Sequence, residues 1–374
     1  MKKLVIAIIL ISIVFFSVGL SVGVFKFFPY YQLDSLKSII LSEENSTRKY
    51  TMDDFVYGVD INSLIDISSV DELKIKRSQL IYYLWNQNDL PQEFPTNIQQ
   101  NIDVSLFSDL KNLKQIDLIE HKMEFGINSI SYMFHPEDSN NKIVFYHQGH
   151  GGDFIKGKNT IEFFLNNGYT VQAFSMLLLG INEKPIVETE FGPIILNSHD
   201  HLKYLESEKF VPLKLFFEPL VVSLNYLDSH FNFDEYYMVG ISGGAWTAMY
   251  YSAIDERISQ TYPVAGPYPL FIRSNYNQIG DYETEHPQLL EIVNELEAYL
   301  MGSFGKDRKF VQIYNKFDSC CWDGEYYKIF ESTIKEKVSE FGSGYYDVII
   351  DDTHHQHIIS DHALILIKNN MEIK

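Results

Sequence analysis

The sequence is poor in cysteine and in positive charge, and both shortages exclude whole classes of protein. Only two of its 374 residues are cysteines, so it has neither a disulfide framework nor a cysteine-rich metal site. Basic residues number 30 against 50 acidic ones, which gives a formal net charge of −20. This balance argues against a nucleic acid or an anionic lipid surface as a partner. Internal repeats and low-complexity tracts are also missing.

Apolar residues, in contrast, are abundant. Hydrophobic residues make up 45% of the chain and aromatic residues 15%, which is typical of a globular protein. A chain of this length can bury one large core or two modest ones.

The two cysteines are adjacent, at Cys320 and Cys321. Neighbouring cysteines can join only in a strained ring, because their Cα atoms lie closer than an ordinary disulfide prefers. The sequence leaves two alternatives open: a disulfide between neighbours or two buried thiols.

The N-terminus predicts export. Lys2 and Lys3 precede an apolar run from Leu4 to Val24, which is long enough to span a bilayer as a helix. We expect residues 1–29 to form a transmembrane signal-anchor, with a cleaved signal peptide as the alternative. The positive-inside rule keeps both lysines cytoplasmic, so the bulk of the chain is expected outside the cytoplasm, membrane-anchored or, after cleavage, secreted.

The rest of the chain divides into a helical extension, residues 30–114, and a larger α/β domain, residues 115–374. The extension contains an expected helix at 70–85 and a shorter one at 106–113. From residue 115, strands alternate with helices, which predicts a mostly parallel central sheet covered by helices. Strands are expected at 116–124, 127–134, 143–146, 169–174, 236–239, 261–265, 310–314 and 345–350; helices are expected at 160–166, 213–227, 325–341 and 359–367. Insertions at about 177–212 and 266–306 interrupt this alternation.

One pentapeptide, Gly240-Ile241-Ser242-Gly243-Gly244, places a serine between glycines where a predicted strand becomes a helix. A serine on such a turn projects its hydroxyl outward, and the glycines tolerate the strained backbone. Ser242 is therefore the candidate nucleophile.

A nucleophilic serine needs a base and a group that orients the base. Three histidines follow the last predicted strand, so the base is His357 or His355, with His354 as a loop residue. Asp318 follows the preceding strand and is the candidate acid. Asp351 and Asp352 are its rivals, although they share the strand end of the histidines. Open α/β sheets place their sites at these carboxyl ends of strands.

An oxyanion requires two N–H donors. One is expected from the backbone of Gly243, at a helix N-terminus. The other is expected from the glycine-rich turn at 147–152, which reads His-Gln-Gly-His-Gly-Gly and follows the strand at 143–146.

With the elbow, the turn, Asp318 and His357 in this order, the chain from about residue 115 to its end resembles the α/β-hydrolase superfamily. It is most similar to bacterial esterases of the acetyl-xylan-esterase and dienelactone-hydrolase kind and to prolyl-oligopeptidase relatives. The resemblance implies Ser242 as nucleophile, His357 as base and Asp318 as acid.

The resemblance also selects between the open candidates. His357 is preferred over His355 because Ser360 completes an H-x-x-S run that often leads into the last helix of such esterases. The second oxyanion donor would be the backbone N–H of His150. Gln148 departs from the family pattern, so Gly149 and Gly151 remain alternative donors.

The expected activity is therefore hydrolysis of a small-molecule or glycan ester, without a cofactor or metal. A prolyl-oligopeptidase-type peptidase is an alternative, and so is a non-catalytic binding protein on this fold. A metallohydrolase is a further alternative, with ligands from His354, His355, His357, His362 and the two aspartates. We disfavour it because adjacent histidines on an extended segment point to opposite faces.

Overall fold

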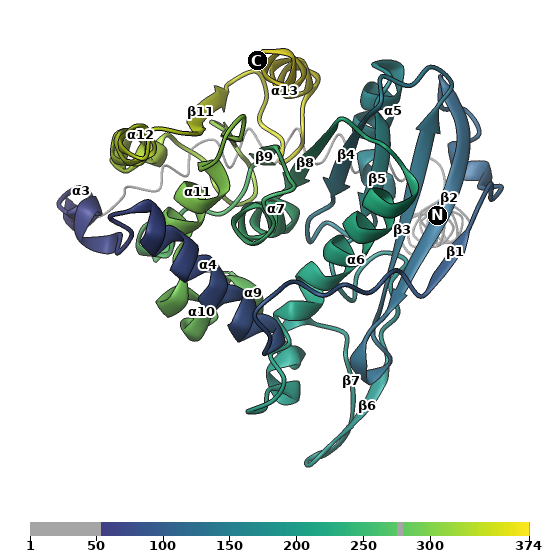
Figure 1. Cartoon of the computed structure of the whole chain (residues 1–374), viewed down its shortest axis with the longest axis horizontal. Helices are drawn as coiled ribbons and strands as arrows, with labels where there is room; N and C mark the ends of the chain where they lie inside the picture. Colours follow the sequence, from purple (N-terminus) through teal and green to yellow (C-terminus); the bar gives the residue numbers. More distant parts are fainter. Residues whose placement is uncertain (1–53, 275–279, 374) are drawn as a thin grey trace, which may run out of the picture. The chain divides into compact units, whose positions relative to one another are not determined.

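The computed structural model describes residues 54–274 and 280–373 (Figure 1). The predicted membrane-spanning run at residues 4–24 lies outside them. In the described ranges no helix combines the length and the apolar character that crossing a bilayer requires.

Nine strands form one sheet in the order β1-β2-β3-β5-β4-β8-β9-β10-β11. The first three strands pair antiparallel, β3 also meets β5 antiparallel, and all later neighbours are parallel. The predicted mostly parallel sheet is thus confirmed. The strands are β1 (Asn97–Gln99), β2 (Leu113–Lys122), β3 (Asn128–Pro136), β4 (Lys142–His147), β5 (Thr170–Phe174), β8 (Glu235–Ile241), β9 (Gln260–Val264), β10 (Lys309–Asn315) and β11 (Tyr345–Asp351).

Helices cover both faces of this sheet (Figure 1). On one face, α5 (Lys158–Asn166) and α13 (Asp361–Glu372) bury their apolar sides against the central strands in a continuous core. On the other face lie α6 (Lys214–His230), α7 (Gly243–Ile254) and α11 (Glu295–Ser303), and α12 (Glu331–Glu340) packs beside β11. Burial on both faces explains why β4 reads as a nearly continuous apolar run, and β5 and β9 are likewise buried along their whole length.

The strand order reverses around β4. From β4 the chain passes through α5 to β5 on one side, and then through α6 to β8 on the other side. Such a reversal opens a crevice at the carboxyl ends of the strands, where α/β sheets bind ligands. The turn after β4 and the serine after β8 both lie at this crevice.

Two predicted helices differ from the structure. The expected helix at 106–113 is a single 3-10 turn, Ser105–Phe107, because Asn112 takes a left-handed backbone with φ of 56° and β2 begins at Leu113. The expected helix at 325–341 is split into a 3-10 turn, Tyr326–Ile329, and the shorter α12.

Both insertions carry structure of their own. The first holds the two-stranded ribbon of β6 (Ile186–Thr189) and β7 (Gly192–Ile195), followed by a 3-10 helix, His199–Leu205. The second holds α8 (Leu270–Arg273), α9 (Tyr282–Glu285), α10 (Pro287–Ile292) and α11.

The described part of the predicted extension packs directly on this domain. It comprises α3 (Asp54–Tyr57), α4 (Val70–Trp85) and β1, which pairs with β2. Ser69 caps α4, and the buried Arg77 donates from it to the carbonyl of Ala253 (2.8 Å) and to that of Met301 (3.1 Å). Arg77 therefore joins α4 to the ends of α7 and α11.

We expect Arg77→Met to lower the free energy of unfolding by about 1–3 kcal/mol, because it removes the side-chain donor to the Ala253 carbonyl and one of the two side-chain donors to the Met301 carbonyl. Urea unfolding monitored by circular dichroism measures this loss. Lys74→Met, at an exposed position of the same helix, is the matched control. Equal stability of the two variants would contradict this role of Arg77.

Candidate active site

Ser242 occupies a strained turn between β8 and α7. Its φ of 57° and ψ of −121° lie in a region that non-glycine residues rarely adopt. The turn is fixed by its backbone, because Ser242 N donates to Val264 O (3.0 Å) and its carbonyl accepts from Ala245 N (2.9 Å). Strain held in this way by the surroundings is typical of functional residues.

The flanking glycines make this turn sterically possible. A Cβ on Gly240 would lie 2.1 Å from the carbonyl oxygen of Gly244, and a Cβ on Gly244 would lie 2.2 Å from that of His147. Larger residues at either position would force the strand, the helix and the neighbouring turn apart. The glycines of the pentapeptide therefore let three segments meet.

The turn at 147–152 packs against this elbow. In the parallel pairing of β4 with β8, His147 lies opposite Gly240. A Cβ on Gly149 would lie 2.6 Å from Ser242 Cβ and 3.1 Å from Gly243 N. The structure thus brings the backbone of this turn into contact with the serine elbow.

Gln148 and His150 have separate surroundings within this turn. Gln148 is buried, and its side-chain oxygen accepts a hydrogen bond from the Tyr146 hydroxyl, so the residue that departs from the family pattern points back toward the core. The ring of His150 lies over Gly243, where an added Cβ would come 2.5 Å from its Nδ1.

Asp318 and His357 come together from the loops after β10 and β11. His357 Nδ1 lies 2.6 Å from Asp318 Oδ2, and the other carboxylate oxygen accepts from the backbone N–H groups of Cys320 (2.8 Å) and Cys321 (3.2 Å). His357 Nε2 is buried and has no hydrogen-bond partner among the described residues. Asp318 thus fixes the orientation of the His357 imidazole through Nδ1, and Nε2 is not used by this contact.

The rival residues have other partners. His355 is exposed and stacks on Phe317, with ring centroids 4.9 Å apart. Asp351 accepts from the Thr353 hydroxyl (2.6 Å) and from Ser360, which also caps α13. Asp352 is exposed. Of these candidates, the structure pairs Asp318 with His357 and directs Asp351 into its own loop.

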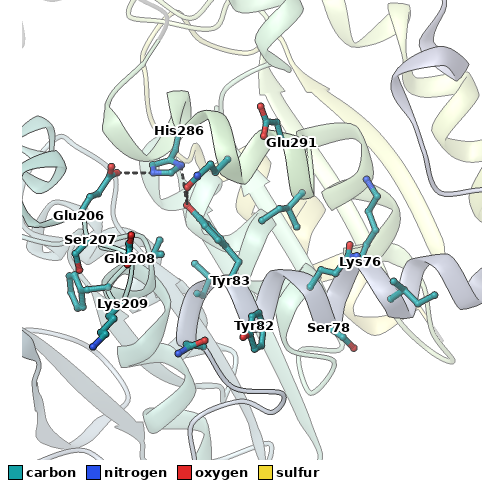
Figure 2. Close-up of a pocket in the computed structure, with 18 of the residues that line it drawn as sticks. Lys76, Ser78, Tyr82, Tyr83, Glu206, Ser207, Glu208, Lys209, His286 and Glu291 are labelled. Atoms are coloured by element: carbon teal, nitrogen blue, oxygen red, sulfur yellow. Dashed lines mark hydrogen bonds and ion pairs between the residues drawn. The ribbon is translucent and has the colours of Figure 1, made fainter.

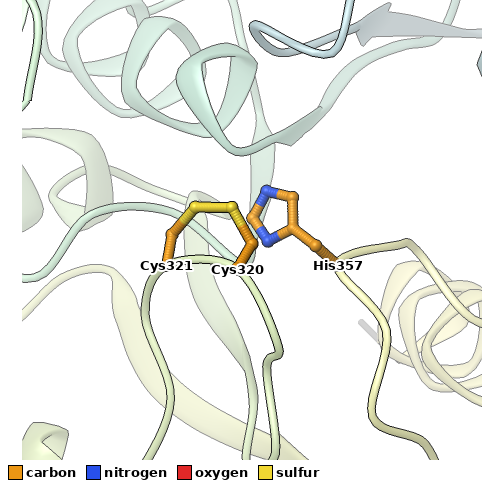
Figure 3. A group of neighbouring side chains, drawn as sticks. All are labelled: Cys320, Cys321 and His357. Atoms are coloured by element: carbon orange, nitrogen blue, oxygen red, sulfur yellow. A yellow bond between two sulfur atoms is a disulfide. The ribbon is translucent and has the colours of Figure 1, made fainter. Parts of the chain in front are cut away.

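A disulfide joins Cys320 to Cys321, so the two neighbours are not free thiols in this structure. Figure 3 shows both sulfur atoms beside the His357 ring, on the loop that carries Asp318. The backbone N–H groups of the two cysteines donate to the Asp318 carboxylate, so the pair helps to position this side chain.

A cavity of about 1150 Å³ lies elsewhere, between α4, residues 206–211 and α10 (Figure 2). In the wall of this cavity, His286 Nε2 lies 2.8 Å from Glu206 Oε1, and Tyr83 lies beside both. Neither Ser242, Asp318 nor His357 lines this cavity. The candidate site therefore lies at the carboxyl ends of the strands and is separate from this cavity.

Solved structures share this arrangement of strands and helices. An acetyl xylan esterase from Paenibacillus sp. R4 superposes with a TM-score of 0.53 at 15% identity, over 84% of this chain and 99% of its own. The chain has the α/β-hydrolase fold. The acetyl xylan esterase 1 from Thermoanaerobacterium sp. JW/SL YS485 gives 0.51 at 12% identity (84% and 98% covered), and a methylesterase gives 0.56 at 11% (82% and 65% covered).

No family model matches the sequence, and no curated protein matches it significantly. The α/β-hydrolase fold of this chain therefore rests on structure alone.

Two residues near the site were missed by sequence reasoning. His199 and Glu283 lie in the two insertions and meet at the ring of His150. Neither stands in a motif, and 84 residues separate them, so only the folded chain reveals the contact.

His147 predicts a measurable pH dependence of stability. Burial lowers the pKa of its imidazole to about 4, helped by the nearby His150 and opposed by a hydrogen bond to the Gln148 carbonyl. Between about pH 6.5 and about pH 4 the unfolded chain therefore binds more protons at this residue than the folded chain does, so stability falls as the solution becomes more acidic.

Between about pH 7 and about pH 4, we expect His147 to lower the free energy of unfolding by about 3 kcal/mol. Urea unfolding at several pH values should show a shallower dependence in His147→Gln than in the wild type. His362→Gln, at an exposed position of α13, should retain the wild-type slope. An unchanged slope in His147→Gln would contradict this assignment.

Proposed function

We propose that the chain is a serine hydrolase that cleaves an ester through Ser242, His357 and Asp318. The observation that carries this proposal is the 2.6 Å pair of His357 and Asp318, whose imidazole has a buried second nitrogen without a partner. The strained serine elbow supplies the nucleophile, and the esterases that share the fold make an ester the first substrate to test.

In the proposed reaction, His357 Nε2 takes the proton of Ser242 Oγ as this oxygen attacks the ester carbonyl carbon. The backbone N–H groups of Gly243 and His150 donate to the resulting oxyanion. The imidazolium, stabilised by Asp318, then gives its proton to the departing alcohol, which leaves an acyl-enzyme. His357 then deprotonates a water molecule, which attacks the acyl carbon. The bond from this carbon to Ser242 Oγ breaks, Oγ takes back the proton from His357, and the carboxylic acid is released.

The remaining proposals concern substrate and location. We propose a small-molecule or glycan ester as the substrate, because two of the solved structures that share this fold are acetyl xylan esterases. The N-terminal apolar run supports action outside the cytoplasm, on a membrane-anchored or secreted chain.

We expect a fluorophosphonate probe to label the wild type and Ser78→Ala, a control at an exposed serine, but not Ser242→Ala. Hydrolysis of p-nitrophenyl esters of increasing chain length, and of acetylated sugars, should be lost with the label. A folded wild type that takes no label would refute the proposal. Labelling together with cleavage of peptides alone would favour the peptidase alternative.

Replacement of the acid and the base should separate His357 from His355. We expect Asp318→Asn to lower kcat about ten-thousand-fold, because the imidazole loses the partner that fixes its tautomer. His357→Ala should cause a comparable loss, whereas His355→Ala should keep kcat within the same order of magnitude. Loss of activity in His355→Ala with retention in His357→Ala would reassign the base.

A further inference from the structure

Three side chains from distant parts of the chain, His150, His199 and Glu283, meet at the turn at 147–152, which carries His150. His150 follows β4, His199 lies in the first insertion, and Glu283 lies in α9 of the second insertion. One nitrogen of each histidine and a carboxylate oxygen of Glu283 all lie within 4.8 Å of one another. Glu283 is fully buried, His199 is nearly so, and the His150 side chain is about one-third exposed (32%).

The hydrogen bonds fix how His199 faces this group. Its Nε2 lies 2.7 Å from the carbonyl oxygen of Leu177, so the ring proton resides on Nε2. In the neutral ring, Nδ1 then presents a lone pair to both oxygens of Glu283, each 3.1 Å away. A lone pair and a carboxylate repel each other, so this contact needs a positive group between them: a proton on Nδ1, the N–H of His150, or a metal ion.

The second histidine brings another nitrogen to the same place. His150 Nε2 lies 3.1 Å from His199 Nδ1, 2.9 Å from Glu283 Oε1 and 3.1 Å from Asp281 Oδ2. Protons on both rings would set two positive N–H groups against each other. A single divalent ion satisfies both nitrogens and the carboxylate at once.

The separations also suit a metal ion. Ligands about 2.0–2.1 Å from a tetrahedral Zn²⁺ lie about 3.3 Å apart, close to the spacings observed here. A zinc-bound histidine commonly donates its other ring N–H to a backbone carbonyl, as His199 does to Leu177.

We propose that His150 Nε2, His199 Nδ1 and Glu283 bind one divalent transition-metal ion of the zinc class, with Asp281 beside the fourth position. The ion links both insertions to the turn that packs on the serine elbow. It acts as a structural tie, separate from the proposed ester chemistry, and this proposal departs from the sequence-based expectation of no metal.

Metal binding can be measured directly on the tag-free chain after removal of metals with a chelator. The metal-free chain is then equilibrated with Zn²⁺ and passed through a gel-filtration column. We expect the wild type to retain about one Zn²⁺ per chain, measured by mass spectrometry of the metal. Glu283→Gln and His199→Gln should weaken binding at least tenfold. His286→Gln, at another buried histidine paired with a glutamate, is the matched control and should bind as the wild type does.

A second measurement does not depend on folding of the variants. X-ray absorption at the zinc edge of the wild type should show nitrogen and oxygen ligands only, including two imidazoles. A zinc–sulfur distance, or loss of zinc in His357→Gln but not in Glu283→Gln, would instead place the ion at Cys320, Cys321 and His357. That result would overturn the proposal, as would a folded wild type that binds no Zn²⁺. Because the readout is bound metal, an inactive enzyme leaves the test intact.

Discussion

The packing of the turn after β4 against the serine elbow after β8 constrains the rest of the site. These two strands are parallel neighbours at the point where the strand order reverses, so their carboxyl ends necessarily face the same crevice. Backbone then meets backbone at Gly149, Gly240 and Gly244, each of which has no room for a side chain. This contact holds the strained serine beside the backbone of the turn at 147–152.

The acid and base depend on a different part of the sheet. β10 and β11 pair in register up to Asn315 and Asp351, so the loops that follow them leave the sheet at the same level. The Asp318 carboxylate is then held by two backbone N–H groups on one oxygen and by His357 on the other. Because the partners of Asp318 come from its own loop and from the facing loop, its orientation requires no contribution from either insertion.

Local patterns predicted most of the regular structure, and tertiary contacts account for what they missed. A fully apolar run predicted β4, and the glycine spacing located Ser242, because these signals lie within a few residues. The expected helix at 106–113 is instead a 3-10 turn at 105–107, since the spacing of apolar residues does not show where the backbone becomes left-handed at Asn112. The role of Asp351 in its own loop, and the meeting of His199 with Glu283, depend on contacts that periodicity cannot encode.

The group formed by His150, His199 and Glu283 differs from the rest of the core in its charge. A fully buried glutamate is costly unless cations surround it, and Glu283 is faced by two imidazole nitrogens, one from the turn after β4 and one from the first insertion. With protons alone, the tie would weaken whenever either ring became neutral. With a metal ion, the same three side chains would hold the His150 turn in place over the whole pH range in which the imidazoles remain ligands. The position of a backbone donor beside Ser242 would then depend on residues from both insertions, which assigns these insertions a part in the architecture of the site.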